Sequence, residues 1–297
     1  MHATSDTPQI ALKTVIYATD FSSCSENAGR YASLLARKFD ADLLVSHSFV
    51  LSQAAMEFEM QAGPSGKSLQ RKDLESALAE AVQRFGQGVK RANQVLLEGD
   101  PREKIPALAR EYAPSIIVLG TSGRGRIERG FVGSVAERIL RATDGPALTV
   151  GPNVPAFDPA SRPISRVLYA TDLPPAAAQA ATYAAGIAGT FQAEMDVLHV
   201  IHPEDEKHPD RLSEVQQRLN AILEGAAPQQ SNAIRNPSSF VEAGGAHEGI
   251  LRHIREFSVD LLVLAIRQST HLWLQARISG AFQIIADAPC PVLTITG

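Results

Sequence analysis

Cysteine is scarce in this chain, and so are long apolar runs and any excess of charge of one sign. Cys24 and Cys290 are the two cysteines among 297 residues, too few for a disulfide framework, which favours a reducing compartment. No segment approaches the roughly 18 consecutive apolar residues of a membrane span, and residues 1–8 lack the basic start and apolar core of a signal peptide. The net charge of −4 gives no electrostatic reason to expect nucleic acid or a membrane as partner. We therefore expect a globular, cytoplasmic protein.

The sequence contains an internal repeat. Residues 15–20, VIYATD, recur 152 residues later as VLYATD at 167–172. Later in each half the spacing becomes 145, and it pairs Gly99 with Gly244, Ser134 with Ser279 and Pro146 with Pro291. A constant register over separate stretches indicates duplication of a whole domain. We predict domains at 1–153 and 154–297, with the proline-rich segment 154–163 as the start of the second and the linker between them.

Each repeat alternates short β-rich runs with amphipathic stretches. In the first repeat, strands are expected at 14–19, 43–49, 94–97, 116–120 and 147–150, and helices from Ser23 onward and at 69–90, 101–112 and 134–143. Ser23 and Glu26 form a capping-box pattern. This alternation predicts an α/β fold, namely two tandem Rossmann-like three-layer sandwiches, each with a five-stranded parallel sheet. If the first and fourth strands are neighbours, Asp20 and Gly120 reach one crevice.

A glycine-rich segment follows the predicted fourth strand. Gly120 ends the apolar run, Gly123 follows, and Gly133-Ser134 opens an amphipathic helix. Glycines allow backbone N–H groups to approach an anion closely, and a helix N-terminus supplies unpaired donors and a positive dipole end. The segment is typical of a phosphate-binding cradle.

The spacing Gly120-x2-Gly123-x9-Gly133-Ser134 resembles the nucleotide-binding motif of the universal stress protein family. The resemblance covers both halves of the chain, although the motif is intact in the first alone. It implies a sandwich of the adenine nucleotide alpha hydrolase type and ATP, with Mg²⁺, as the ligand. It also implies that the last strands, 147–150 and 292–296, pair, which makes the repeats an intramolecular pseudo-dimer; a homodimer of chains is a further option.

The family's binding residues can be placed on this sequence. By the resemblance, the adenosine part contacts Ala18, Thr19 and Asp20, the adenine is held by the backbone at Ser48, and the ribose and phosphates contact Gly120, Thr121, Gly123, Gly133, Ser134 and Val135. Arg124, Arg126 and Arg129 lie in the basic loop, and their charge could add charge-assisted contacts to a triphosphate.

Simpler explanations stand beside these assignments. Ser134 and Glu137 form a capping-box pattern, so Ser134 could serve its own helix alone. Asp20 could be an ordinary loop-starting aspartate, and the arginines could be solvated surface charges. Cys24 near a helix start could have a lowered pKa and a redox role, or be an ordinary helix residue.

The second repeat lacks the cradle. At the 145 spacing, Gly120 becomes Ala265, Gly123 becomes Gln268 and Gly133 becomes Ile278, while Ser279 is kept. We predict that this repeat binds no ATP, because side chains replace the bare backbone and Ile278 crowds the helix start. The scattered histidines of this half give no helical spacing typical of zinc, and His199 matches His47 of the first repeat instead.

Three functions are compatible with these features. The first is a nucleotide-binding stress or signalling protein that holds ATP in the first repeat. The second is an ATPase or phosphotransferase, but apart from Asp20 no carboxylate is placed to hold Mg²⁺ or orient a nucleophile, so slow turnover at most is expected. The third is a scaffold with an empty site, which the intact glycine set argues against.

Overall fold

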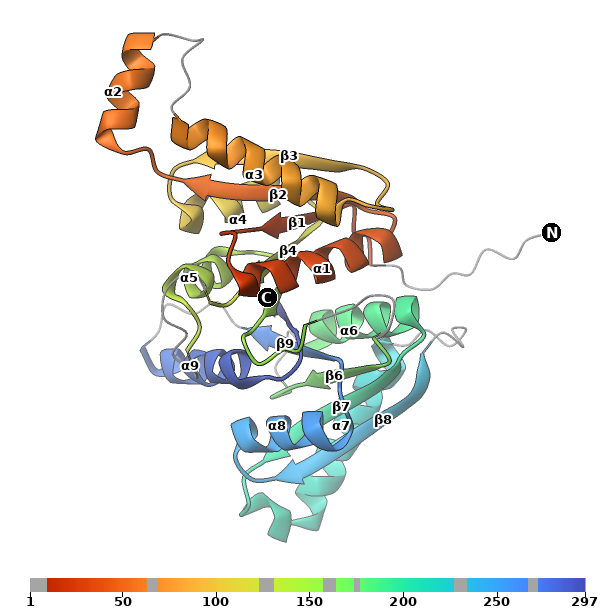
Figure 1. Cartoon of the computed structure of the whole chain (residues 1–297). Helices are drawn as coiled ribbons and strands as arrows, with labels where there is room; N and C mark the ends of the chain where they lie inside the picture. Colours follow the sequence, from red (N-terminus) through yellow and green to blue (C-terminus); the bar gives the residue numbers. More distant parts are fainter. Residues whose placement is uncertain are drawn as a thin grey trace, which may run out of the picture. The chain divides into compact units, whose positions relative to one another are not determined.

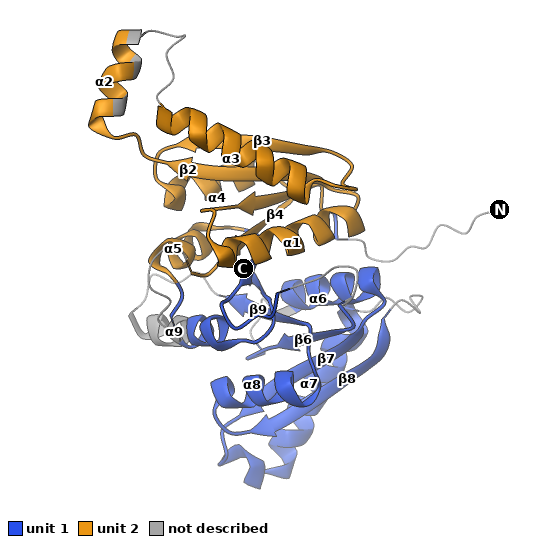
Figure 2. Cartoon of the chain, viewed as in Figure 1, with its two compact units in different colours: residues 1–11, 127–132, 145–297 blue, residues 12–126, 133–144 orange. Residues whose placement is uncertain are grey.

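The computed structural model describes residues 10–62, 69–122, 131–156, 164–173, 177–226, 234–266 and 272–296. The chain divides into two compact units, shown in Figure 2. The first-repeat unit comprises 12–126 and 133–144, and the second-repeat unit comprises 1–11, 127–132 and 145–297. Strands and helices alternate in both, so the predicted pair of α/β folds is confirmed.

The first-repeat unit has four parallel strands in the order β3-β2-β1-β4 (Figure 1). The strands are β1 (Thr14–Ala18), β2 (Asp42–Phe49), β3 (Ala92–Glu98) and β4 (Ser115–Gly120). The helices are α1 (Ser23–Lys38), α2 (Gln53–Ala62), α3 (Leu69–Phe85), α4 (Pro101–Glu111) and α5 (Ser134–Ala142). The sequence did not predict α2, and α3 ends before the expected residue 90.

The second-repeat unit contains its own strands and the last strand of the first repeat, in the order β5-β10-β9-β6-β7-β8. The strands are β5 (Ala147–Val150), β6 (Arg166–Ala170), β7 (Glu194–Ile201), β8 (Arg235–Ala243), β9 (Leu261–Ile266) and β10 (Val292–Thr296). The helices are α6 (Ala177–Phe191), the 3₁₀ helix η2 (Asp205–Lys207), α7 (Pro209–Ala226), α8 (Ala246–Glu256) and α9 (Leu272–Asp287). All pairings are parallel except that of β5 with β10, which is the pairing of last strands expected from the sequence.

Helices cover both faces of the first-repeat sheet, and β1 and β4 are apolar on both sides. Tyr17 faces α1 and α3, where its ring meets Phe85 edge-on at 5.4 Å between ring centres. Its neighbour Ile16 packs on the other side with Leu108 of α4. This two-sided burial explains why both strands are continuous hydrophobic runs. The pairing of β1 with β4 brings their carboxyl ends together, as the predicted crevice requires.

None of the helices within the described ranges has the length and apolar character needed to cross a membrane.

Candidate functional site

The turn after β1 is held by short side-chain hydrogen bonds. The Thr19 carbonyl accepts a hydrogen bond of 2.7 Å from Nδ1 of His47 on β2, and the Thr19 hydroxyl accepts one from the Phe21 backbone N–H at 2.9 Å. Phe21 lies in the left-handed region at φ 60°. Oδ1 of Asp20 accepts from both the backbone N–H and the hydroxyl of Ser22, at 3.0 and 2.6 Å. These two bonds fix the Asp20 carboxylate at the carboxyl ends of the strands.

A cavity of about 330 Å³ opens between the carboxyl ends of the strands and the helices α4 and α5. Its walls are Ala18, Thr19, Asp20, Ser46, His47, Ser48, Pro101, Ile105, Leu119, Gly120, Thr121, Gly133, Ser134, Val135, Ala136 and Ile139. The structure thus brings together every predicted site residue that it describes. Gly123 and Arg124, with Arg126 and Arg129, lie outside the described residues.

Several wall residues were not predicted. Ile105 of α4 and Ile139 of α5 form apolar sides of the cavity, and neither was singled out from the sequence. Ser48 was predicted to hold the adenine through its backbone. Its hydroxyl donates a 2.7 Å hydrogen bond to the Gly99 carbonyl, so this side chain is engaged in joining the ends of β2 and β3.

The start of α5 lies in the cavity wall and has no side-chain cap. The N-cap residue is Gly133, not Ser134, and it makes no side-chain capping bond. The capping-box explanation of Ser134 is therefore wrong, and Glu137 instead pairs with Arg141 at 2.7 Å. The Gly133 N–H donates to the Thr121 carbonyl at 2.7 Å. The first-turn N–H groups that follow have no intrahelical acceptors, as at any helix start.

Both described glycines of the motif are required by packing. A Cβ on Gly120 would lie 2.9 Å from the Ser25 backbone nitrogen in α1, and one on Gly133 would lie 2.9 Å from the Thr121 carbonyl oxygen. Real Cβ atoms essentially never show such distances. Packing alone therefore explains why residues 120 and 133 are glycines, whether or not a ligand contacts them.

Cys24 does not have the character of a redox thiol. It is buried beside Thr121 and Ser122, and burial raises the pKa of the thiol, although hydrogen bonds from that loop oppose the shift. The sequence-based alternative of a lowered pKa is therefore wrong.

The second repeat retains a cavity of about 310 Å³ at the carboxyl ends of its own strands. Its turn is built alike, because Nδ1 of His199 donates to the Thr171 carbonyl at 2.7 Å, which bears out the matching of His199 with His47. The lining differs: Val200 and Ala265 stand where the first repeat has Ser48 and Gly120.

The helix behind this second cavity also begins elsewhere. α9 starts at Leu272, about two helical turns before Ser279, the counterpart of Ser134. The prediction that Ile278 crowds a helix start is therefore wrong, since residue 278 lies inside α9. Within the described ranges no cluster of three or more histidine, cysteine or acidic side chains could hold a metal ion.

Comparison with known proteins places these features in a family. The profile of the Universal stress protein family matches residues 11–151 and again 163–296. Universal stress protein MJ0531 of Methanocaldococcus jannaschii is 28% identical over 143 residues, which are 46% of this chain and 81% of that protein. A putative universal stress protein of Staphylococcus epidermidis is 32% identical over 136 residues, 44% of this chain and 80% of that protein.

Solved structures agree over nearly the whole chain. A universal stress protein from Archaeoglobus fulgidus has a TM-score of 0.71 at 20% identity, covering 95% of this chain and 98% of that one. A putative universal stress protein from Pseudomonas aeruginosa has a TM-score of 0.66 at 15% identity, covering 96% and 94%. The chain belongs to the universal stress protein family and carries two domains of that family in tandem.

Proposed function

We propose that the first repeat binds ATP, with Mg²⁺, and that the second does not. The observation that carries the proposal is the start of α5, which presents uncapped N–H groups to a cavity that also holds Asp20 and His47. An anion is stabilised at such a helix start by the unpaired donors and the helix dipole.

The cavity suits the two ends of a nucleotide differently. Near β1 and β2 it offers the fixed Asp20 carboxylate and the strand-end backbone, which can hydrogen-bond a ribose or a base edge. Ile105 and Ile139 provide apolar sides for a planar base. The phosphates would lie at the α5 end, where Ser134 and Val135 begin the helix. Gly123 and Arg124, which lie outside the described residues, remain proposed phosphate contacts.

The second repeat has an equivalent cavity without the donors. Because α9 begins two turns earlier, the N–H groups around Ser279 lie in the helix interior, where they pair with carbonyls four residues back. Val200 in place of Ser48 makes the wall more apolar. We therefore expect each chain to bind one nucleotide.

The site is built for binding more than for turnover. Asp20 is the single carboxylate among the described wall residues, and Ser22 already bonds one of its oxygens. Phosphoryl transfer needs ligands for Mg²⁺ and a group that orients the nucleophile. A slow ATPase or phosphotransferase is the alternative function. In either case we place the protein in the cytoplasm, acting in stress response or signalling, with its repeats as a pseudo-dimer of domains 1–153 and 154–297.

Calorimetric titration of the purified chain with ATP and Mg²⁺ tests the proposal. We expect one site per chain, loss of binding in Gly133→Ile, which copies Ile278, and unchanged binding in Asp172→Asn beside weakened binding in Asp20→Asn. ADP and cAMP are titrated in parallel, and released phosphate is followed over hours to detect hydrolysis. Two sites per chain, or equal effects of the Asp20 and Asp172 changes, would contradict the asymmetry. No heat and no thermal protection by ATP would overturn the proposal itself.

A further inference from the structure

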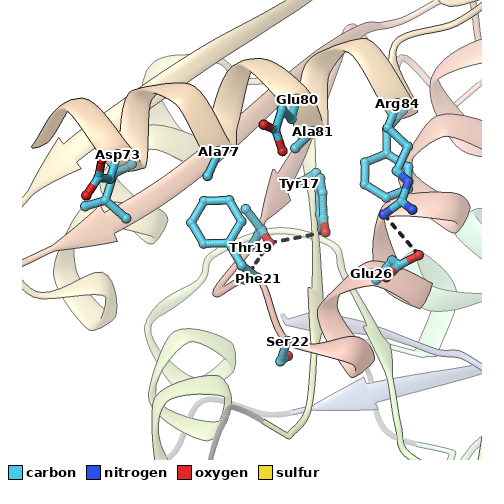
Figure 3. Close-up of a pocket in the computed structure, with 12 residues that line it drawn as sticks. Tyr17, Thr19, Phe21, Ser22, Glu26, Asp73, Ala77, Glu80, Ala81 and Arg84 are labelled. Atoms are coloured by element: carbon cyan, nitrogen blue, oxygen red, sulfur yellow. Dashed lines mark hydrogen bonds and ion pairs between the residues drawn. The ribbon is translucent and has the colours of Figure 1, made fainter. Parts of the chain in front are cut away.

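A second, larger cavity lies on the opposite face of β1 in the first-repeat unit. It measures about 570 Å³ and is formed by α3, the start of α1 and the turn after β1. Figure 3 shows its walls, with Asp73, Ala77, Glu80, Ala81 and Arg84 along α3 across from Tyr17, Thr19 and Phe21. The nucleotide proposal makes no use of this cavity.

The floor of the cavity is aromatic. Tyr17, Phe21 and Phe85 contribute rings, and Tyr17 and Phe85 meet edge-on at 5.4 Å. The Tyr17 hydroxyl donates to the Ser25 carbonyl at 2.7 Å, so its hydrogen is already used inside the protein. Tyr17 and Phe85 are buried and Phe21 is half-buried, so the ring surface open to a ligand is mainly that of Phe21, and aromatic surface attracts apolar groups and cations.

The rim of the cavity carries an excess of negative charge. Glu26, Asp73 and Glu80 supply three carboxylates, and Arg84 supplies one guanidinium. Arg84 is already paired with Glu26 at 3.1 Å. The carboxylates of Asp73 and Glu80 on exposed α3 positions are left to act on a ligand, and they disfavour anions.

The second repeat shows what can occupy the corresponding place. Helices α3 and α7 align through their buried residues, since Leu78 and Phe85 of the one have the same spacing as Leu219 and Ala226 of the other. On this alignment, Arg218 stands where the first repeat has Ala77. The Arg218 guanidinium donates a 3.0 Å hydrogen bond to the Leu173 carbonyl. Leu173 is the counterpart of Phe21 and has the same left-handed backbone, with φ 58° against 60°.

From these observations we propose that the α1–α3 cavity of the first repeat binds a small organic cation, a guanidinium or ammonium group attached to an apolar body. In the second repeat, the guanidinium of Arg218 reaches the corresponding position beside the turn at Leu173. In the first repeat the residue there is an alanine, and the surroundings combine aromatic rings with an acidic rim. The ligand would place its charge near Asp73 and Glu80 and its apolar part on the rings. This site lies on the opposite face of β1 from the proposed nucleotide, and Thr19 borders both cavities.

Nuclear magnetic resonance titration of the full chain with benzylammonium and n-butylguanidinium tests the proposal, with benzyl alcohol and benzoate as neutral and anionic probes. We expect saturable shifts in α3 and residues 19–22 with the two cations at millimolar concentrations, and markedly weaker ones with the other probes. Ala77→Arg, which copies the second repeat, should abolish the shifts. Asp73→Asn and Glu80→Gln should each raise the dissociation constant about two- to fivefold.

Glu75→Gln is the matched control, because it removes a charge from α3 at a position outside the cavity wall. It should leave cation binding unchanged, and Ala77→Arg should leave ATP titration unchanged, so the two proposals fail separately. Benzyl alcohol binding as tightly as benzylammonium, or cation shifts persisting in Ala77→Arg, would overturn the inference. If Ala77→Arg does not fold, equal cation affinity in the wild type and the Asp73→Asn/Glu80→Gln variant would overturn it as well.

Discussion

His253 of α8 is fully buried and bonds two carboxylates. Its Nδ1 lies 3.0 Å from Oε1 of Glu242, and its Nε2 lies 3.4 Å from Oδ2 of Asp196. Arg166 reaches the same Asp196 oxygen at 2.8 Å. At the equivalent positions the first repeat has an apolar cluster of Leu44, Leu97 and Leu108. Sequence spacing could not reveal this ionic group, because its members are scattered along the chain and Asp196 is 57 residues from His253.

The titration of this group gives a pH-dependent stability. Burial alone would lower the pKa of His253, but Asp196 and Glu242 raise it. Burial alone would raise the pKa of Glu242, but His253 and Arg252 lower it. The contribution of His253 is therefore complete below its unfolded pKa of 6.5 and is lost as pH rises through the higher folded value. That of Glu242 is complete above 4.5 and is lost as pH falls through the lower folded value.

We predict the outcome of urea unfolding for two variants of this group. His253→Leu alone should cost about 1.5–3 kcal/mol, because it removes the imidazole hydrogen bonds to both carboxylates, while Arg166 still pairs with Asp196 and Arg252 with Glu242. The triple variant Asp196→Leu/Glu242→Leu/His253→Leu copies the first repeat and should recover most of that loss. Relative to the triple variant, the wild type should be favoured most between pH 4.5 and 6.5 and progressively less above it. A difference that is constant across pH would contradict the assignment.

At the scale of elements, the two repeats differ in where the helix after the fourth strand begins. The sequence predicted the start of α5 at residue 134, because Gly133 and the amphipathic pattern coincide there. It did not predict that α9 begins at Leu272, because the repeat alignment transferred the first helix start to Ser279. The first helix likewise uses Ser22 rather than Ser23 as its N-cap, with the Ser22 side chain accepting from the Ser25 N–H.

The approach of α1 to β4 gives a prediction about Gly120. Gly120→Ala would place a Cβ 2.9 Å from the Ser25 backbone nitrogen, so backbone must move, and we expect a loss of about 1–3 kcal/mol in the free energy of unfolding. Gly145→Ala is the control, because no atom lies within 4 Å of its added Cβ. Equal unfolding midpoints of the two variants in urea would show that α1 shifts without cost.

At the scale of the whole molecule, duplication and fold class could be predicted from the sequence. The repeat register and the alternation of strands and helices follow from local patterns, whereas the pairing of the last strands was implied by the family resemblance. The two cavities beside β1 could not be predicted fully, because each joins side chains from helices far apart in sequence. Ile105 and Ile139, for example, lie 34 residues apart in sequence, on α4 and α5, and line the same cavity.

Strand pairing predicts that the repeats stay associated when the chain is cut. β5 and β10 are joined by backbone pairing and by the hydroxyls of Thr149 and Thr294, which donate to the carbonyls of Val292 and Ala147 at 3.0 and 3.1 Å. Fragments 1–153 and 154–297, co-expressed with one tag, should purify together. Thr149→Pro should reduce recovery of the untagged fragment, because proline cannot donate in the ladder, whereas Lys90→Ala, whose partner Asp40 lies in the same fragment, should not. Separate elution of the wild-type fragments would contradict this pairing in solution.

The same strand pair sets an order of events during synthesis. β5 leaves the ribosome well before β10 exists, and at the usual elongation rates the intervening residues take on the order of ten seconds to translate. For that interval the hydrogen-bonding edge of β5 has no partner from its own chain, and uncovered edges recruit foreign strands. The nascent first repeat is thus most vulnerable to aggregation while the ribosome is still making the second.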